Sequence, residues 1–142
     1  MMGDTIHLDL VTPERRLISG DVTEMVAKAI LGEFGVLPGH ANLLAILQPG
    51  ELSFVQEGKK HHVAVTGGFA EVTLDHGIRI MADAAELADE IDLERAKAAK
   101  ERAEKRLAEF DPLTQEIDLA RAEGALRRSL VRLEVAEKVE SS

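Results

Sequence analysis

Hydrophobic and polar residues alternate along much of the first half of the chain. The alternation has a period of two residues in the segments 6–12, 51–55, 61–66, 69–74 and 78–82. A period of two is typical of strands that bury one face. Two further apolar segments, 17–18 and 22–30, lie on either side of Ser19, Gly20 and Asp21, and turns rich in glycine fall at 57–59, 67–68 and 75–77. This spacing predicts an antiparallel β-sandwich or barrel.

The segment 32–42 is the part of the chain richest in turn residues. It contains Gly32, Gly35, Pro38 and Gly39, and the apolar run 43–47 follows it. One interpretation is a structural turn whose glycines supply positive φ, and the other is a loop shaped for docking. The residues alone leave both interpretations open.

The period changes in the second half of the chain, where two related helices are predicted. Ten of the eleven glycines precede residue 78, and Ala, Glu, Lys, Arg and Leu dominate after Asp89. The segment 91–107 recurs at 117–133 with nine of seventeen positions identical. We therefore predict a β-sandwich domain at 1–86 and a two-helix antiparallel hairpin at 87–142.

The ends and faces of these helices can be assigned from the residue types. Asp89 or Asp92 can cap the first helix, and Asp111 followed by Pro112 can start the second. The apolar stripes are expected at Ala96, Ala99, Ala103 and Leu107 in the first helix, and at Leu119, Leu126, Leu130 and Leu133 in the second. Because the first stripe is mainly alanine, it buries little area and predicts a weakly packed, labile hairpin.

Arginines repeat on one face of both predicted helices. Arg95, Arg102 and Arg106 have equivalents 26 positions later at Arg121, Arg128 and Arg132. Offsets of seven and eleven keep one helical face, so a folded hairpin can bring these guanidinium groups to one region. Such a group of arginines binds an anion, pairs with carboxylates, or stays in solvent.

Composition excludes several classes of function. The chain has no cysteine, which excludes disulfides and thiol chemistry, and its net charge of −9 with no Trp or Tyr argues against nucleic acid as a partner. No apolar run approaches the roughly 20 residues that span a bilayer, so a soluble protein is expected.

No sequence motif for catalysis is present. The chain lacks GxxxxGK[ST], GxGxxG and GxSxG, and its five histidines lack metal-ligand spacing; His61 and His62 are expected on opposite faces of one strand. We therefore expect no enzymatic activity and no metal site.

Four ordered motifs carry a family resemblance. HLDLVTPERRLISGDV, GEFGVLPGHANLL, VTGGFAEVT and IDLERAKAAKERAEKRL, taken in this order, resemble the epsilon subunit of bacterial and chloroplast-type rotary ATP synthases over nearly the whole chain. Two details depart from the family pattern, namely Asn42 where proline is common and the apolar approach at 29–31. Both concern loop detail.

The resemblance implies a non-catalytic rotor subunit that couples rotation to catalysis. Its sandwich would bind the gamma subunit and the membrane ring of c subunits, and its mobile hairpin would inhibit ATP hydrolysis by reaching the alpha and beta subunits when extended. The complex would place the protein at the cytoplasmic face of the cell membrane as a peripheral component. The alternative is a free-standing sandwich and hairpin that acts as an interaction module.

The resemblance also implies site residues. Glu33 and His40, in the loop from 33 to 42, are candidate contacts with the c ring. The motif of ATP-binding epsilon subunits stands at 91–96, so the implied ATP contacts are Glu86, Ile91, Asp92, Arg95, Ala96, Arg102, Arg121 and Arg128. ATP would be a regulatory ligand, with no cofactor required and the role of Mg²⁺ left open. The same arginines could instead contact acidic segments of the catalytic subunits.

Overall fold

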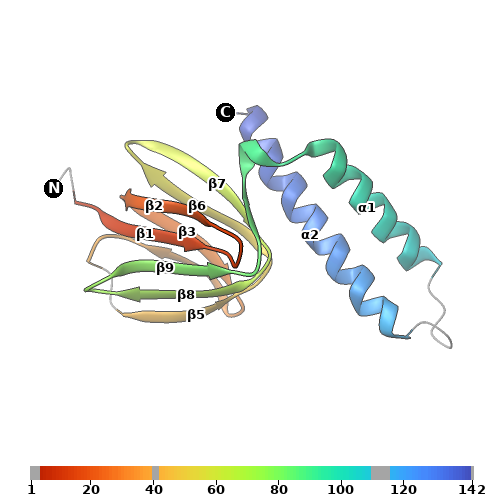
Figure 1. The fold of residues 1–142 in the computed structure, drawn as a ribbon, viewed down its shortest axis with the longest axis horizontal. Coiled ribbons are helices and arrows are strands. Elements are labelled where there is room, and N and C mark those ends of the chain that lie inside the picture. Colours follow the sequence, from red (N-terminus) through yellow and green to blue (C-terminus); the bar gives the residue numbers. More distant parts are fainter. Residues whose placement is uncertain (1–3, 40–41, 110–115, 142) are drawn as a thin grey trace. The chain divides into compact units, whose positions relative to one another are not determined.

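The computed structural model describes residues 4–39, 42–109 and 116–141. At 116–118 and 139–141 it describes the backbone alone. The chain forms two compact units, Met1–Leu87 and Ala88–Ser142. The division lies one residue beyond the boundary expected from composition. Figure 1 shows the strands of the first unit and the helices of the second.

The described part of the first unit is built from strands. In chain order they are β1 (Ile6–Val11), β2 (Arg16–Val22), β3 (Glu24–Ala29), β4 (Gly32–Val36), β5 (Leu43–Leu47), β6 (Gly50–Gln56), β7 (Lys59–Val65), β8 (Gly68–Thr73), β9 (Gly77–Ala82) and β10 (Ala85–Leu87).

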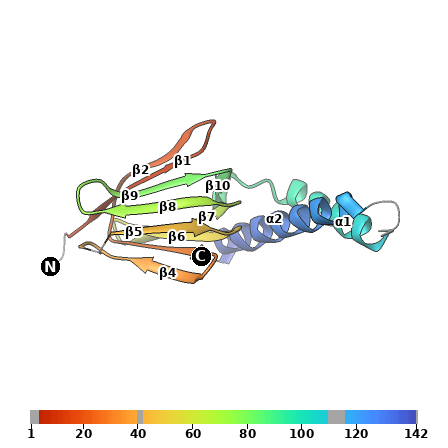
Figure 2. The ribbon, with the colours of Figure 1, turned by 90° about the horizontal axis from the view of Figure 1, so that it is seen from below.

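These strands form one hydrogen-bonded sheet that folds over a shared core. The order is β10-β7-β6-β3-β5-β8-β9-β1-β2, and β4 pairs with β3 outside this path. Adjacent strands are antiparallel except β1 and β9, which run parallel with Leu10 opposite Ile80. Figure 2 shows the strands stacked in layers. The predicted β-sandwich is therefore confirmed, with one parallel pair that the sequence pattern did not indicate.

Aliphatic side chains fill the space between the layers. The largest side chains that are fully buried in this unit are Leu8, Leu10, Met25, Leu52, Ile78 and Ile80, together with Val22, Val36, Val63 and Val72. They alternate with outward residues along β1, β3 and β8, as the period of two requires, whereas three consecutive residues are buried at 52–54 in β6 and at 63–65 in β7. Gly68 allows β8 to approach β9 closely, since a Cβ there would lie 2.1 Å from the Met81 carbonyl oxygen.

The structure corrects two details of the predicted strands. Residues 32–36 form β4, where a turn or loop was expected, because Val36 is buried and the segment pairs with β3 from Met25 to Ala29. Ser19, Gly20 and Asp21 lie inside β2 because pairing with β1 continues through them. Tertiary pairing overrides the local turn preference of glycine and serine at both places.

The second unit contains a short 3₁₀ helix η1 (Ala88–Glu90), α1 (Leu93–Ala108) and α2 (Glu116–Ser141). Asp92 is the N-cap of α1, where its side chain accepts a hydrogen bond from the Arg95 backbone N–H at 3.1 Å. Of the two predicted caps, Asp92 is therefore the one used, and Asp89 belongs to η1. The expected restart at Asp111 and Pro112 lies outside the described residues.

The two helices pack as an antiparallel pair (Figure 1). Buried and half-buried positions follow a three-four spacing in each helix, as in a coiled-coil seam. The seam positions are Leu93, Ala96, Lys100, Ala103 and Leu107 in α1, and Leu119, Ala122, Leu126, Ser129, Leu133 and Ala136 in α2. The first five of each set correspond in the sequence repeat, so the two copies present equivalent faces. Leu130, expected on the apolar stripe, is instead 45% exposed.

No helix in the described ranges is long and apolar enough to cross a membrane.

Candidate functional site

The arginines of the repeat lie along one flank of the helical seam. Arg95 and Arg102 directly precede the buried Ala96 and Ala103, and their equivalents Arg121 and Arg128 precede Ala122 and Ser129. One residue turns an α-helix by about 100°. The four side chains therefore have the same angular offset from the seam.

The antiparallel packing places the arginines of both helices on the same side of the pair. An antiparallel pair with equivalent faces has an approximate two-fold axis perpendicular to the plane that contains both helices. Rotation about this axis exchanges the helices, so residues with the same offset from the seam lie on the same side of the pair. We call this side the basic flank; it contains Arg95, Arg102, Arg106, Arg121, Arg128 and Arg132. The six arginines therefore lie on one side of the helix pair but are spread along its length, since the 11 residues from Arg95 to Arg106 span about 16 Å of helix.

Most of the charged residues that directly follow seam positions are acidic. This acidic flank contains Glu94, Glu101, Glu104, Glu123, Glu134 and Glu137, together with Lys97 and Arg127 as its cations. The hairpin thus separates its charges between two sides of one seam. Charge of one sign on one side attracts ligands of the opposite sign.

Four arginines of the basic flank are available to a ligand. Arg95, Arg102, Arg121 and Arg128 are exposed, and none of them forms an ion pair with another residue in the described ranges. Of the three alternatives, pairing with carboxylates is not seen for these four arginines among the described residues, whereas exposure to solvent and binding of an anion both fit their exposed positions. Exposed guanidinium groups that form no ion pair can bind phosphate oxygens in a bidentate manner.

Three residues predicted beside the arginines have distinct environments in the same unit. Ile91 is half-buried before α1, and the exposed Asp92 caps the helix through one carboxylate oxygen. Ala96 is 0% exposed, so it offers no surface of its own to a ligand. Glu86 lies half-buried in β10, which belongs to the first unit.

Of the two predicted contacts with the c ring, Glu33 lies within the described residues. Glu33 lies on β4 with an exposed side chain, and its backbone pairs with Lys28 of β3. His40 lies outside the described residues.

An exposed apolar surface crosses the outside of the sandwich and was not predicted. Ile46, Phe69 and Met81 are register neighbours on β5, β8 and β9, with exposed fractions of 63%, 44% and 49%. Leu44, Ile30 and Leu31 extend this surface around a groove of about 550 Å³ between β5 and the β3–β4 hairpin. Large exposed apolar surfaces mark sites of protein interaction.

The sequence held a signal for this surface. The run Leu43 to Leu47 is apolar at every position, whereas a strand with one face in water should alternate. Phe69 and Met81 could not be found in this way, because only the β5–β8–β9 register places them beside Ile46.

The histidines of β7 have structural contacts. His61 stacks on Phe54 with ring centroids 4.9 Å apart, while His62 hydrogen-bonds to Glu51. The two rings thus point to opposite faces of the strand, as predicted. No group of three or more potential metal ligands occurs among the described residues.

Comparisons with known families follow this division of the chain. Residues 5–88 match the model of the β-sandwich domain of the ATP synthase delta/epsilon chain, and residues 89–137 match the model of its long α-helix domain. The fold and its charged hairpin thus define a two-domain subunit of an ATP synthase. The chain belongs to the ATP synthase delta/epsilon chain family.

Individual relatives agree with this assignment. The chain is 51% identical over 104 residues to an ATP synthase epsilon chain of Solibacter usitatus, covering 73% of this chain and 77% of the relative. It is 46% identical to that of Nitratidesulfovibrio vulgaris, covering 76% and 80%. These similarities give the chain the role of an epsilon-type subunit in the rotor stalk of ATP synthase.

A solved structure extends the similarity to the whole chain. A chain of the Euglena gracilis mitochondrial ATP synthase, in a structure of OSCP, F1 and the c-ring, superposes with a TM-score of 0.68. It is 27% identical, and the match covers 99% of this chain and 82% of that one. A chain from the central stalk and c-ring of Tetrahymena thermophila ATP synthase, 16% identical with a TM-score of 0.62, has the same fold.

Proposed function

We propose that this subunit is non-catalytic and regulates ATP synthase from the rotor, with the sandwich as its anchor and the hairpin as an ATP-sensitive brake on hydrolysis. The observation that carries the proposal is the basic flank, whose exposed arginines come from both helices. A ligand that bridges α1 and α2 stabilises the closed hairpin.

The exposed apolar surface of the sandwich is the proposed contact with the gamma subunit. Ile46, Phe69 and Met81 would be buried by a partner, and the groove beside Leu44 would accept an apolar side chain. Burying one large aliphatic or aromatic side chain contributes about 1.5–3 kcal/mol. The c ring would be approached by the segment 33–42, with Glu33 and His40 as polar contacts. This assembly would hold the subunit at the cytoplasmic face of the membrane.

ATP is the proposed ligand of the basic flank. The triphosphate carries several negative charges, and Arg95, Arg102, Arg121 and Arg128 provide bidentate donors from both helices. Asp92 and Ile91, at the start of α1, would contact the ribose and base, with Glu86 as a further candidate. No cofactor is required for this role.

Ligand binding would act on an equilibrium between two hairpin states. In the closed state the helices pack along the seam, and in the extended state they would reach the alpha and beta subunits and obstruct rotation. ATP would favour the closed state by RT ln(1 + [ATP]/Kd), where Kd is the dissociation constant. The small seam residues Ala96, Ala103, Ala122 and Ser129 support this step, because each of them would lose little apolar area on opening; the half-buried leucines of the seam and the buried Val135 would account for most of the cost.

Calorimetric titration of the full chain with ATP and ADP tests the ligand. Arg95→Ala and Arg121→Ala should each weaken ATP binding about 10- to 100-fold, since a hydrogen bond to a charged group contributes about 1.5–3 kcal/mol. Arg127→Ala is the matched control, because Arg127 is exposed on the acidic flank. Equal losses in all three variants would mean a general effect of net charge, and no binding at millimolar ATP would reject the ATP site.

A second experiment separates the anchor from the brake. Ile46→Asp should lower incorporation of the subunit into the purified complex, whereas Glu104→Gln on the acidic flank should not. Disulfide bonds that lock the two helices together should relieve inhibition of ATP hydrolysis in the reconstituted complex. If the locked hairpin inhibited as strongly as the free one, the brake would have another origin.

The alternative of a free-standing interaction module predicts the opposite outcome for incorporation. Such a protein would purify alone and would not accompany the other subunits. Family membership across both units favours the ATP synthase subunit.

A further inference from the structure

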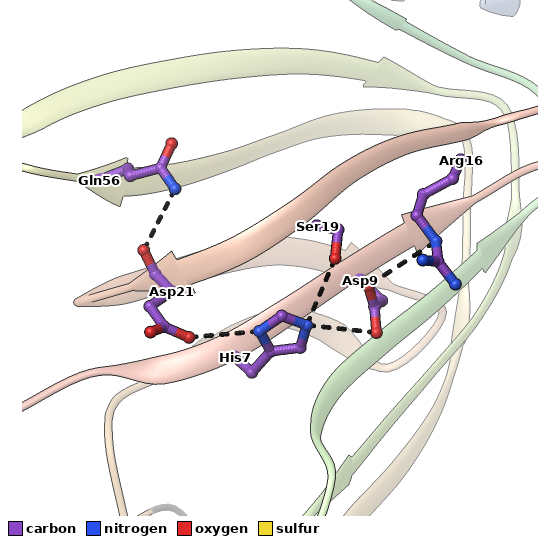
Figure 3. A network of polar contacts seen from close by, with 6 residues as sticks. All are labelled: His7, Asp9, Arg16, Ser19, Asp21 and Gln56. Carbon is purple, nitrogen blue, oxygen red and sulfur yellow. Dashed lines mark hydrogen bonds and ion pairs between the residues drawn. The ribbon is translucent and has the colours of Figure 1, made fainter.

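A histidine lies between two carboxylates on β1 and β2, the last pair of strands in the sheet order (Figure 3). His7 of β1 places Nδ1 3.2 Å from Asp21 Oδ1 on β2 and Nε2 3.4 Å from Asp9 Oδ2 on its own strand. The strand register sets this arrangement, because His7 lies opposite Asp21 and Asp9 lies opposite Ser19. Both ring nitrogens of His7 therefore face a carboxylate.

The protonation state of His7 decides how many of these contacts are favourable. The imidazolium carries two N–H donors and can satisfy both carboxylates, whereas neutral imidazole carries one donor. In the neutral form one nitrogen has no proton to donate to its carboxylate; the Ser19 hydroxyl, 3.5 Å from Nε2, also hydrogen-bonds to Asp9, so its single proton cannot satisfy both acceptors at once. Histidine changes charge between about pH 5 and 8, so this difference falls in an accessible range.

We propose that His7 is a proton-responsive clasp between β1 and β2, closed by the imidazolium in mildly acidic solution and partly released by the neutral ring. The clasp is a property of the sandwich and does not depend on the proposed ATP site. Its position matters because β2 ends the sheet order and pairs only with β1 on that path.

Neighbouring groups keep the Asp9 carboxylate ionised in mildly acidic solution. The Ser19 hydroxyl holds the pKa of Asp9 below its usual value; partial burial opposes this shift, and His7 and Arg16 support it. Asp9 thus stays ionised when His7 gains its proton. Arg16 Nε lies 4.0 Å from Asp9 Oδ1, on the oxygen that His7 does not approach.

The groove beside His7 presents charges of both signs. Asp75 and His76 of the β8–β9 turn and Arg79 of β9 line it together with His7 and Asp9. The β6 neighbour, Gln56, is uncharged and donates its amide N–H to the Asp21 carbonyl oxygen at 3.3 Å. Among the described residues, the His76 side chain forms no ion pair with Asp9 or Asp21, which makes His76 the matched control.

Hydrogen exchange of the full chain between pH 5.5 and 8 tests the clasp. Rates are corrected for intrinsic chemical exchange and expressed relative to peptides from β6 and β7. Protection of peptides from β1 and β2 should fall about two- to fivefold as pH rises, the range expected for exposed ion pairs. The sign follows from the partners, since His7 gains its favourable contacts only when protonated.

Two variants and one control make the result decisive. His7→Gln should abolish this pH dependence, and Asp21→Asn should reduce it; Asp21 is 66% exposed, so its replacement should not prevent folding. His76→Gln should keep the full response. An unchanged pH response in His7→Gln, or no response in the wild type, overturns the proposal.

Discussion

The sandwich and the hairpin are stabilised by different kinds of packing. The sandwich buries large aliphatic side chains completely, Leu8, Leu10 and Ile80 among them, whereas the buried positions in the described parts of α1 and α2 are mostly small, namely Ala96, Ala103, Ala122, Ser129 and Ala136, with Val135 as the one larger side chain. Buried apolar area contributes about 25 cal/mol per Å², so each side chain contributes much less in the seam. The comparison teaches that one chain can combine a unit built on large buried aliphatic side chains with a helical unit whose buried positions are mostly small.

The strongest test of this comparison is a cavity in the sandwich core. Leu10→Ala should destabilise the sandwich by about 2–5 kcal/mol, because Leu10 is 0% exposed and its removal leaves a cavity. Urea unfolding followed through amide signals of each unit measures the change. Leu44→Ala is the control, since Leu44 is 71% exposed, and its effect should stay below about 0.5 kcal/mol. Similar losses in both variants would contradict the assigned core.

A larger side chain in the seam should have the next largest effect. Ala103 is 2% exposed, and Ala103→Leu should destabilise the hairpin by about 1–3 kcal/mol through overpacking. Thermal unfolding measured by circular dichroism at 222 nm reports the helices. Ala108→Leu, at an exposed position of the same helix, should be nearly neutral. A stabilised hairpin in Ala103→Leu would mean that the helices are not closely packed there.

A glycine inside α2 offers a change of opposite sign. Gly124→Ala should stabilise the hairpin by up to about 1 kcal/mol, because glycine is a poor helix former. A Cβ at this position would lie 3.2 Å from Arg128 Nη1, so the flexible guanidinium must shift slightly. Melting curves should rise for Gly124→Ala and fall for the exposed Ala120→Gly. A lower melting temperature in Gly124→Ala would show that the Arg128 contact outweighs helix propensity.

The smallest expected effect is a pH dependence in the sandwich. Since the pKa of Asp9 is lowered in the folded state, its contribution to stability is present above the unfolded value of about 3.9 and is lost as pH falls through the folded value. Asp9→Asn should therefore cost about 0.5–1 kcal/mol at pH 7 and progressively less below pH 4. Urea midpoints of both proteins between pH 2 and 7 measure this. A constant difference would remove Asp9 from the acid response.

Much of the fold could be predicted because local periodicity reports it directly. The period of two indicated the sandwich strands, and the repeat indicated both helices and a common face for their arginines. The prediction failed at β4 and inside β2, where glycine suggested turns but pairing with a neighbouring strand determines the backbone. Such pairing joins residues distant in sequence, so no local pattern reveals it.

The candidate sites divide in the same way. The sequence by itself determined the spacing of the arginines, because a helix fixes it through its own geometry, and it narrowed the cap of α1 to Asp89 or Asp92. The structure decided for Asp92. Only the tertiary structure decided that six glutamates occupy the opposite flank, that Ile46, Phe69 and Met81 form one surface, and that His7 meets Asp21. These relations depend on the seam between two helices and on strand register, which arise when distant segments bury apolar area together.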